Sequence, residues 1–231
     1  MRHSKRFREL GVKVEKEKEY EFSEAIGLLK ELASAKFDET VEVSVRLGID
    51  PKRDHVRGTT TLPHGTGKAK CILVITDGEF VKKAQSAGAD FVGSDDYLKR
   101  IESGWFDFDV MIATPDMMPK ISKFGKLLGP RGLMPNPKSG TVTQDVEKAI
   151  KEVKLGKVEF KMDKAGCIHC GVGKVSFDEK KIEENIFQLL KGLLEAKPAG
   201  AKGTYFKTVT LSSTMGPGIR LNSRSLLEVL K

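Results

Sequence analysis

Four short segments near the two ends of the chain show a strict alternation of apolar and polar residues. In segment 37–50, for example, Val41, Val43 and Val45 alternate with polar side chains. Side chains on a strand point alternately to its two faces, so each segment predicts a strand with one buried and one polar face. The short link 163–166 joins the second and third segments as a predicted hairpin. The other three segments are 158–162, 168–172 and 203–214.

Two further segments have apolar residues at the spacing of an α-helix. Segment 23–35 begins with Ser23, a residue type that caps helices, and carries Ile26 and Leu29 on one side. Segment 178–197 has a longer apolar stripe and ends before a proline. Both segments predict amphipathic helices that cover the buried faces of the strands.

The middle of the chain, 68–157, has a different pattern. Its short strands, such as 71–75 and 110–113, are almost entirely apolar, and segments of helical periodicity separate them. Such strands are typical of a sheet that helices cover on both faces. We therefore predict a three-layer α/β domain of Rossmann-like topology. Its third strand is 91–93, and its helices are 79–87, 95–103, 115–128 and 142–153.

The outer pieces, 1–67 and 158–231, each contain too few elements to bury their apolar faces alone. Together they provide four one-sided strands and two one-sided helices, which fit a single α+β layer pair. We predict that they form one discontinuous domain, a four-stranded antiparallel-type sheet with two helices, into which the middle domain is inserted. The crossings contain Gly65, Gly67 and Gly156, which lower the cost of backbone rotation and predict a hinge.

The charge of the chain suggests a partner. The 231 residues include 40 Lys and Arg against 32 Asp and Glu, which gives a net charge of +8. This excess favours a polyanionic partner, of which nucleic acid is the commonest. Segment 1–19 has a basic start without apolar periodicity, which leaves an RNA contact and a solvated terminus equally open. The basic residues of this start are Arg2, Lys5, Arg6 and Arg8.

The cysteines and the histidine between two of them predict neither a metal site nor catalysis. Cys167 and Cys170 are three residues apart, so a strand directs their sulfurs to opposite faces. For His169 no Ser or Asp partner can be named, so we expect an RNA contact or a solvated residue and not a general base. With three cysteines, no apolar leader and no apolar run near the ~20 residues of a membrane span, we expect a cytosolic protein.

The polar face of segment 203–214 is a row of hydroxyl groups. Hydroxyls both donate and accept hydrogen bonds, which suits phosphate, ribose and base edges. From this strand alone, however, an ordinary solvated sheet face is the slightly better interpretation, because Thr favours strands. The hydroxyl residues are Thr208, Thr210, Ser212 and Thr214, and the cations beside them are Lys202, Lys207, Arg220 and Arg224.

Segment 120–138 holds five basic residues and no acid, and its glycines and prolines predict an exposed loop. Such a loop favours a contact with nucleic acid or with another protein. The spacing of a phosphate-binding enzyme loop is absent, which weakens the alternative of a nucleotide-binding enzyme built on the inserted α/β domain. A protein-only scaffold is a third alternative. The basic residues are Lys120, Lys123, Lys126, Arg131 and Lys138.

Four separated motifs give the chain a family resemblance. They are SSTMGPG at 212–218, GKLLGPRGLMPNPKSGTVT at 125–143, LPHGTGK at 62–68, and DKAG at 163–166 with the IH and GKV that follow it. A chain with these motifs in this order resembles the bacterial large-subunit ribosomal protein L-one family, the proteins of the mobile stalk beside the ribosomal exit site. A departure is Cys170-Gly171, where the family usually has an apolar residue and proline.

The resemblance implies binding to large-subunit ribosomal RNA, contact with deacylated transfer RNA as it leaves the exit site, and repression of the protein's own messenger RNA. It also implies a cytoplasmic ribosomal protein that is monomeric when free, has no cofactor, metal or membrane contact, and is not an enzyme. The main RNA surface then lies on the discontinuous domain. Its implied residues are Lys36, Phe37, Thr40, Glu42, Lys161, Lys164, Gly166, His169, Thr208, Thr210, Ser212, Ser213, Thr214, Met215 and Gly216.

Overall fold

The computed structural model describes residues 4–15, 17–51, 53–198, 200–201, 203–223 and 226. Three cations named from the sequence, Arg2, Lys202 and Arg224, lie outside these residues. Within the described part of the chain, none of the helices is both long enough and apolar enough to span a membrane.

The chain divides into two compact units, Met1–Gly67 with Gly156–Lys231 and Lys68–Leu155. The second crossing thus falls before Gly156 and not between residues 157 and 158, where we predicted it. The reason is that Gly156 already bonds within the first unit, where its C=O accepts from the Leu62 N–H at 3.2 Å.

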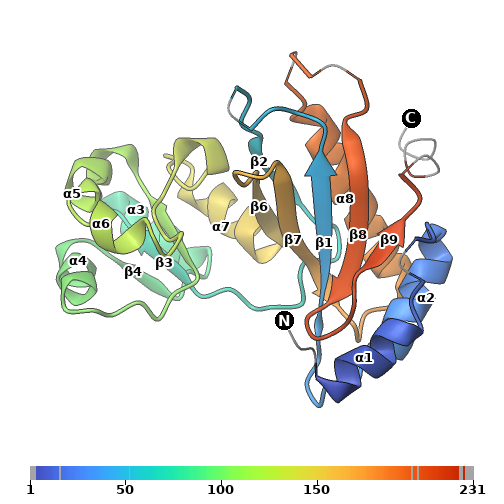
Figure 1. Cartoon of the computed structure of the whole chain (residues 1–231). Helices are drawn as coiled ribbons and strands as arrows, with labels where there is room; N and C mark the ends of the chain where they lie inside the picture. Colours follow the sequence, from blue (N-terminus) through green and yellow to red (C-terminus); the bar gives the residue numbers. More distant parts are fainter. Residues whose placement is uncertain are drawn as a thin grey trace. The chain divides into compact units, whose positions relative to one another are not determined.

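The first unit is built on a four-stranded antiparallel sheet with the order β7-β1-β8-β9 (Figure 1). Val41, Val43 and Val45 of β1 are at most 1% exposed, and the apolar stripes of helices α2 and α8 join them in one hydrophobic core. The alternate, polar residues of the strands lie on the opposite face. The elements are α2 (Phe22–Leu32), β1 (Thr40–Leu47), β7 (Cys167–Lys174), α8 (Glu179–Glu195), β8 (Phe206–Ser213) and β9 (Ile219–Leu221).

The predicted hairpin of 158–162 with 168–172 is wrong. β6 (Lys157–Lys161) pairs instead with β2 (Arg57–Thr61) in a separate two-stranded antiparallel sheet. β2 has the sequence RGTTT, which shows no apolar alternation and therefore gave no sign of a strand. Gly58 permits the pairing, because a Cβ at this position would come within 2.7 Å of the Phe160 ring. The fourth strand of the main sheet is consequently β9.

The first unit also contains a helix that the sequence did not predict. In α1 (Lys5–Val12), Ser4 caps the N-terminus and its Oγ accepts from the Phe7 N–H at 3.3 Å. Of its apolar residues Phe7, Leu10 and Val12, only Leu10 is buried, and three such residues in a short helix are too few to show a clear helical period. The predicted cap of the next helix is also wrong, since α2 begins at Phe22 with Glu21 at the N-cap position.

The second unit has a three-stranded parallel sheet with the order β4-β3-β5. Successive residues of β3 belong to two different hydrophobic clusters, one with α4 and α5 and the other with α3 and α7, so helices lie on both faces. This is the arrangement that continuous apolar strands predict. The elements are β3 (Ile72–Ile75), α3 (Glu79–Ser86), β4 (Phe91–Gly93), α4 (Asp95–Glu102), β5 (Val110–Ala113), η1 (Pro115–Met117), α5 (Met118–Ser122), α6 (Gly125–Leu128), η2 (Pro137–Ser139) and α7 (Val146–Lys154).

Two expectations for the second unit need correction. Segment 120–138 is not simply a loop, because its buried residues Ile121 and Leu128 hold the short helices α5 and α6 against the core. Helix α7 begins at Val146 and not at residue 142, because Val142 forms an isolated parallel bridge with Ala113, the last residue of β5.

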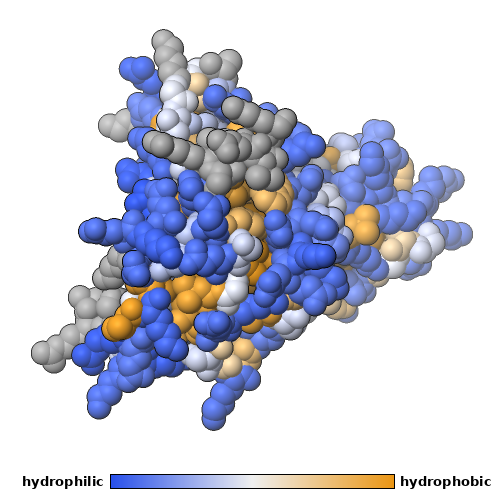
Figure 2. Space-filling model, turned by 90° about the vertical axis from the view of Figure 1, so that its right-hand side faces the viewer, coloured by the Kyte–Doolittle hydropathy of each residue, from blue (hydrophilic) through white to orange (hydrophobic). Residues whose placement is uncertain are grey.

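Figure 2 shows the molecule from the side of α1, α2 and β9. Hydrophilic residues cover most of this side, and hydrophobic residues reach the surface in one central patch. Val12, at the end of α1, is 85% exposed. On the polar face of the four-stranded sheet, by contrast, the exposed side chains are polar on every strand.

Candidate nucleic-acid interface

The polar face of the four-stranded sheet brings together residues that are far apart in the sequence. Ser44 of β1 pairs with His169 of β7 on one side and with Thr210 of β8 on the other. Thr210 in turn pairs with Arg220 of β9. One row of polar side chains thus crosses all four strands. A parallel row contains Gly171, Glu42 and Ser212, and a third contains Cys167, Arg46 and Thr208.

In the row that crosses all four strands, the side chains are short on the central strands β1 and β8 and longer on the edge strands β7 and β9, whereas the neighbouring rows carry the exposed Glu42 and Arg46 on β1. Ser44, Thr210 and Ser212 are partly exposed, while His169 and Arg220 are exposed. Arg220 also forms an ion pair with Glu19 at 3.2 Å. Because these hydroxyl side chains are short, the backbone of a bound nucleic acid can approach the sheet closely. The hydroxyl groups can both donate hydrogen bonds to it and accept hydrogen bonds from it.

His169 has the two partners that the sequence could not name. Its Nδ1 lies 2.9 Å from Ser44 Oγ, and its Nε2 lies 4.0 Å from Asp163 Oδ2. The N–H groups of Cys167 and Ala165 donate to the Asp163 carboxylate and hold the pKa of Asp163 below its ordinary range. The carboxylate therefore stays ionised near neutral pH and can orient the imidazole. Strand register brings Ser44 to His169, and Asp163 lies before the turn that leads into β7, so neither partner could be named from the sequence. That His169 contacts RNA stays a prediction.

The two cysteines lie on opposite faces of β7, as the alternation predicts. Cys170 belongs to the hydrophobic core, and burial raises the pKa of its thiol to about 12. Cys167 is partly exposed and pairs with Arg46 on the polar face. The two thiols therefore cannot contribute to the same metal site.

At one end of the face, the loop 33–39 meets the loop 214–218. The Thr40 N–H donates to Thr214 Oγ1 at 2.9 Å, and the Thr214 N–H donates to the Thr40 C=O at 3.1 Å. Phe37 and Met215 are 56% and 45% exposed. The predicted residues Lys36, Phe37, Thr40, Thr214, Met215 and Gly216 all belong to this corner, although the hydroxyl of Thr214 already binds the backbone of Thr40.

A buried carboxylate that the sequence analysis missed connects these two loops. Glu39 is 2% exposed, and its two oxygens accept from the N–H groups of Ala35 at 3.0 Å and Met215 at 2.9 Å. Burial alone would raise the pKa of Glu39, but the two N–H groups together with the nearby Ser213 hydroxyl and the charge of Arg6 bring the pKa below its ordinary value. An acid at the start of a strand gives no sequence signal of this role, because its donors depend on the tertiary fold.

Two other predicted residues are explained by packing. Ser213 is only 4% exposed, so its side chain lies on the buried side of β8 and offers little surface to a ligand. Gly216 packs closely in this turn, because a Cβ there would come within 2.5 Å of Ser213 Oγ and would displace that hydroxyl.

The opposite end of the face holds the remaining predicted residues. Lys161 ends β6, and Lys164 and Gly166 lie in the turn before β7. The Gly166 C=O accepts from the Leu47 N–H at 2.9 Å, which ties this turn to the end of β1. A cleft of about 680 Å³ lies here, lined by Pro51, His55, Lys161, Met162, Asp163 and Lys164.

The comparison with known families identifies the chain. Residues 29–217 match the model of the ribosomal protein L1p/L10e family, a range that includes both ends of the face. The chain belongs to this family. It is therefore a structural protein of the large ribosomal subunit that binds ribosomal RNA.

The second unit of this family member presents the five predicted cations on its surface, and all five are exposed. Lys120 pairs with Asp95 at 2.9 Å, and the Arg131 guanidinium lies 3.9 Å from the centre of the Phe106 ring. Among the described residues, the side chains of Lys123, Lys126 and Lys138 contact no acid and are available to a polyanion.

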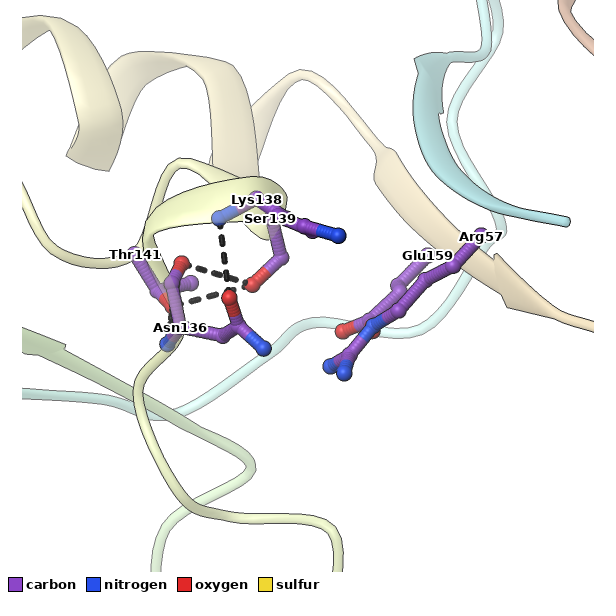
Figure 3. Close-up of polar contacts among 6 residues, drawn as sticks. All are labelled: Arg57, Asn136, Lys138, Ser139, Thr141 and Glu159. Atoms are coloured by element: carbon purple, nitrogen blue, oxygen red, sulfur yellow. Dashed lines mark hydrogen bonds and ion pairs between the residues drawn. The ribbon is translucent and has the colours of Figure 1, made fainter. Parts of the chain in front are cut away.

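The turn that carries Lys138 is fixed by a compact set of hydrogen bonds (Figure 3). The Asn136 side chain accepts from the Lys138 N–H at 2.9 Å, while Ser139 Oγ donates to the Asn136 C=O at 3.0 Å. The Asn136 N–H donates to Thr141 Oγ1 at 2.8 Å.

In the first unit, Arg57 Nε of β2 donates to Glu159 Oε1 of β6 at 2.6 Å, which neutralises the one acid of that strand pair (Figure 3).

Within the first unit, the crossing segments of this protein are closely packed. A Cβ on Gly156 would come within 2.4 Å of the Gly65 Cα, and Gly156 has a φ of 102°. The buried Asn185 amide donates to the Gly65 C=O at 2.9 Å and accepts from the His64 N–H at 3.1 Å. Close packing and left-handed backbone thus account for glycine at 65 and 156, independently of any hinge.

Proposed function

We propose that the polar face of the four-stranded sheet is the ribosomal RNA site of this protein. The observation that carries the proposal is the row His169, Ser44, Thr210 and Arg220, which places hydrogen-bonding groups on all four strands. A hydroxyl-rich row flanked by charges of both signs recognises the shape and 2′-hydroxyls of a structured RNA, whereas a uniformly basic surface attracts any polyanion.

Each part of the face has its own task in this proposal. The exposed Phe37 ring offers a stacking surface for a base, and Met215 offers an apolar contact. Glu42, in the second row, accepts from base amino groups or a ribose hydroxyl. Lys36 at one end, and Lys161 and Lys164 at the other, contact phosphates.

The finer roles implied by the family belong to the same proposal. The protein assists the release of deacylated transfer RNA from the exit site of the ribosome. It also represses translation of its own messenger RNA, which imitates the ribosomal RNA site and competes for the same sheet face. The free protein is monomeric. The cations of segment 120–138 add a contact that depends on charge and not on RNA sequence.

The two units move relative to each other in this proposal, with the crossings at Gly65, Gly67 and Gly156 as the hinge. Distances between spin labels on the two units should show a broad distribution in the free protein. A single narrow distribution that RNA does not change would contradict the hinge.

The site is tested by removal of the central hydroxyls. Ser44→Ala with Thr210→Val should weaken binding to the cognate ribosomal RNA stem by about tenfold to a hundredfold, because the RNA groups that faced the hydroxyls lose their partners. Ser86→Ala, an exposed hydroxyl of α3, is the control and should bind like the parent. The RNA stem and the leader of the protein's own messenger should compete for one site. Unchanged binding by the double variant would refute the proposal.

A further inference from the structure

The corner formed by loops 33–39 and 214–218 is organised around a buried charge. Glu39 is almost fully buried, and an ionised carboxylate in such a position is stable only when hydrogen bonds replace its water. Its two backbone donors, Ala35 and Met215, belong to different loops. One side chain therefore joins two segments that are far apart in the sequence.

These two loops carry the exposed groups of the corner. Lys36 and Phe37 lie between Ala35 and Glu39 in the first loop, and Met215 itself is in the second. If such loops were free to move, RNA binding would have to order them, and this loss of conformational freedom would weaken the affinity. A contact that fixes the loops in the free protein removes this cost.

The contacts of Asp38 hold loop 33–39 on the side that faces β7, away from loop 214–218. The Asp38 carboxylate accepts from the Ser176 N–H at 3.2 Å and from Ser176 Oγ at 2.8 Å. Lys174 Nζ donates to the Asp38 C=O at 3.3 Å and to Thr40 Oγ1 at 2.9 Å. These bonds lead to the end of β7. The bonds that lead to loop 214–218 are that of Glu39 with Met215 and two between Thr40 and Thr214, of which one joins the Thr40 N–H to the Thr214 hydroxyl and the other joins the Thr214 N–H to the Thr40 C=O.

We propose that Glu39 is a positioning residue for RNA binding. It holds the loop with Lys36 and Phe37 against the loop with Met215 before RNA arrives, so the RNA meets a preassembled corner. Glu39 is buried and does not itself contact the RNA. This inference rests on the proposed function of the polar sheet face.

The variant Glu39→Gln separates positioning from charge. Glutamine keeps the shape and one oxygen acceptor, but its NH₂ group faces the second backbone donor and releases one loop. Removal of a negative charge by itself strengthens binding to a polyanion. We nevertheless expect cognate RNA to bind about tenfold to a hundredfold more weakly, while scrambled RNA binds no more weakly than to the parent. Glu31→Gln, an exposed carboxylate of α2, makes the same charge change and should bind cognate RNA as tightly as the parent or slightly more tightly.

Amide hydrogen exchange of the full-length parent gives an independent readout. The amides of Ala35 and Met215 should be protected in the free protein, and at least one of them should exchange faster in Glu39→Gln. The inference is overturned if both parent amides exchange freely until RNA is added, or if a folded Glu39→Gln binds cognate RNA like the parent. If Glu39→Gln does not fold, exchange in the parent decides alone. If the parent does not distinguish cognate from scrambled RNA, the proposed function fails, whereas the exchange result still tests whether Glu39 fixes the two loops.

Discussion

The polar sheet face of the first unit and the basic segment 120–138 of the second unit both suit a polyanion, but they are built differently. On the sheet face, the central groups are hydroxyls fixed by strand register, and the loops at one end are joined by the buried Glu39. In the basic segment, Lys123, Lys126 and Lys138 extend from short helices and a turn, and they contact no acid among the described residues. The difference teaches that specificity needs fixed geometry, whereas attraction needs only charge.

The largest effect is expected at the corner of the sheet face. Phe37→Ala should lower affinity for the cognate stem by about tenfold to a hundredfold, because base stacking on an aromatic ring contributes ~1–3 kcal/mol. The salt dependence should not change, because every phosphate contact remains in place. Leu127→Ala, an apolar residue of the second unit that is 44% exposed, is the matched control. Binding titrations at several salt concentrations measure both; a changed salt slope for Phe37→Ala would show that the corner acts through charge.

The basic segment should respond in the opposite way. Replacing Lys123, Lys126 and Lys138 by Ala should flatten the salt dependence of RNA binding by roughly 0.7 to 0.9 for each phosphate that the protein no longer neutralises. Cognate and scrambled RNA should weaken alike, so the ratio of their affinities stays constant. A collapse of that ratio would place the specific site in the second unit and would contradict our assignment.

The buried carboxylate should make stability depend on pH in the acidic range. The pKa of Glu39 is lowered below its ordinary value of 4.5 in the folded protein, so its contribution is present above that value and is lost as the pH falls through the folded pKa. Glu39→Gln should therefore be less stable than the parent at pH 7, and the difference should shrink as the pH falls below 4.5 towards the lowered pKa of Glu39. Thermal unfolding of both proteins between pH 3 and pH 7 checks this expectation. If the difference in stability between the two proteins stays constant over this range, the fold does not lower the pKa of Glu39.

The smallest effect on specificity should follow removal of the whole second unit. A chain that joins 1–67 to 156–231 through a short Gly-Ser linker should fold, because its hydrophobic core is made within the first unit. It should distinguish cognate from scrambled RNA as the full chain does, and lose only the charge-dependent part of the affinity. Circular dichroism establishes folding, and the affinity ratio is the decisive number. A folded chain without discrimination would show that specificity does not reside in the first unit.

Local sequence patterns determined much of the fold. The alternation of Val41, Val43 and Val45 correctly predicted a strand with one buried face, because period-two patterning leaves a strand few other orientations. The continuous apolar run at β3 correctly predicted burial on both faces in a parallel sheet. In both cases the information lies in consecutive residues, so no knowledge of distant contacts is needed.

Which segments meet was decided by the tertiary structure alone. β6 pairs with β2, because the ring of Phe160 fits over Gly58, and the polar sequence of β2 gave no local sign of this. His169 obtains Ser44 from a strand, and Glu39 obtains Met215 from a loop, each more than a hundred residues away in the chain. The sequence by itself thus determined the faces of the strands and the family, through local periodicity and motifs. The strand partners and the buried carboxylate that joins two loops were decided by long-range packing, because a residue's hydrogen-bond partners depend on which chain segments the core brings together.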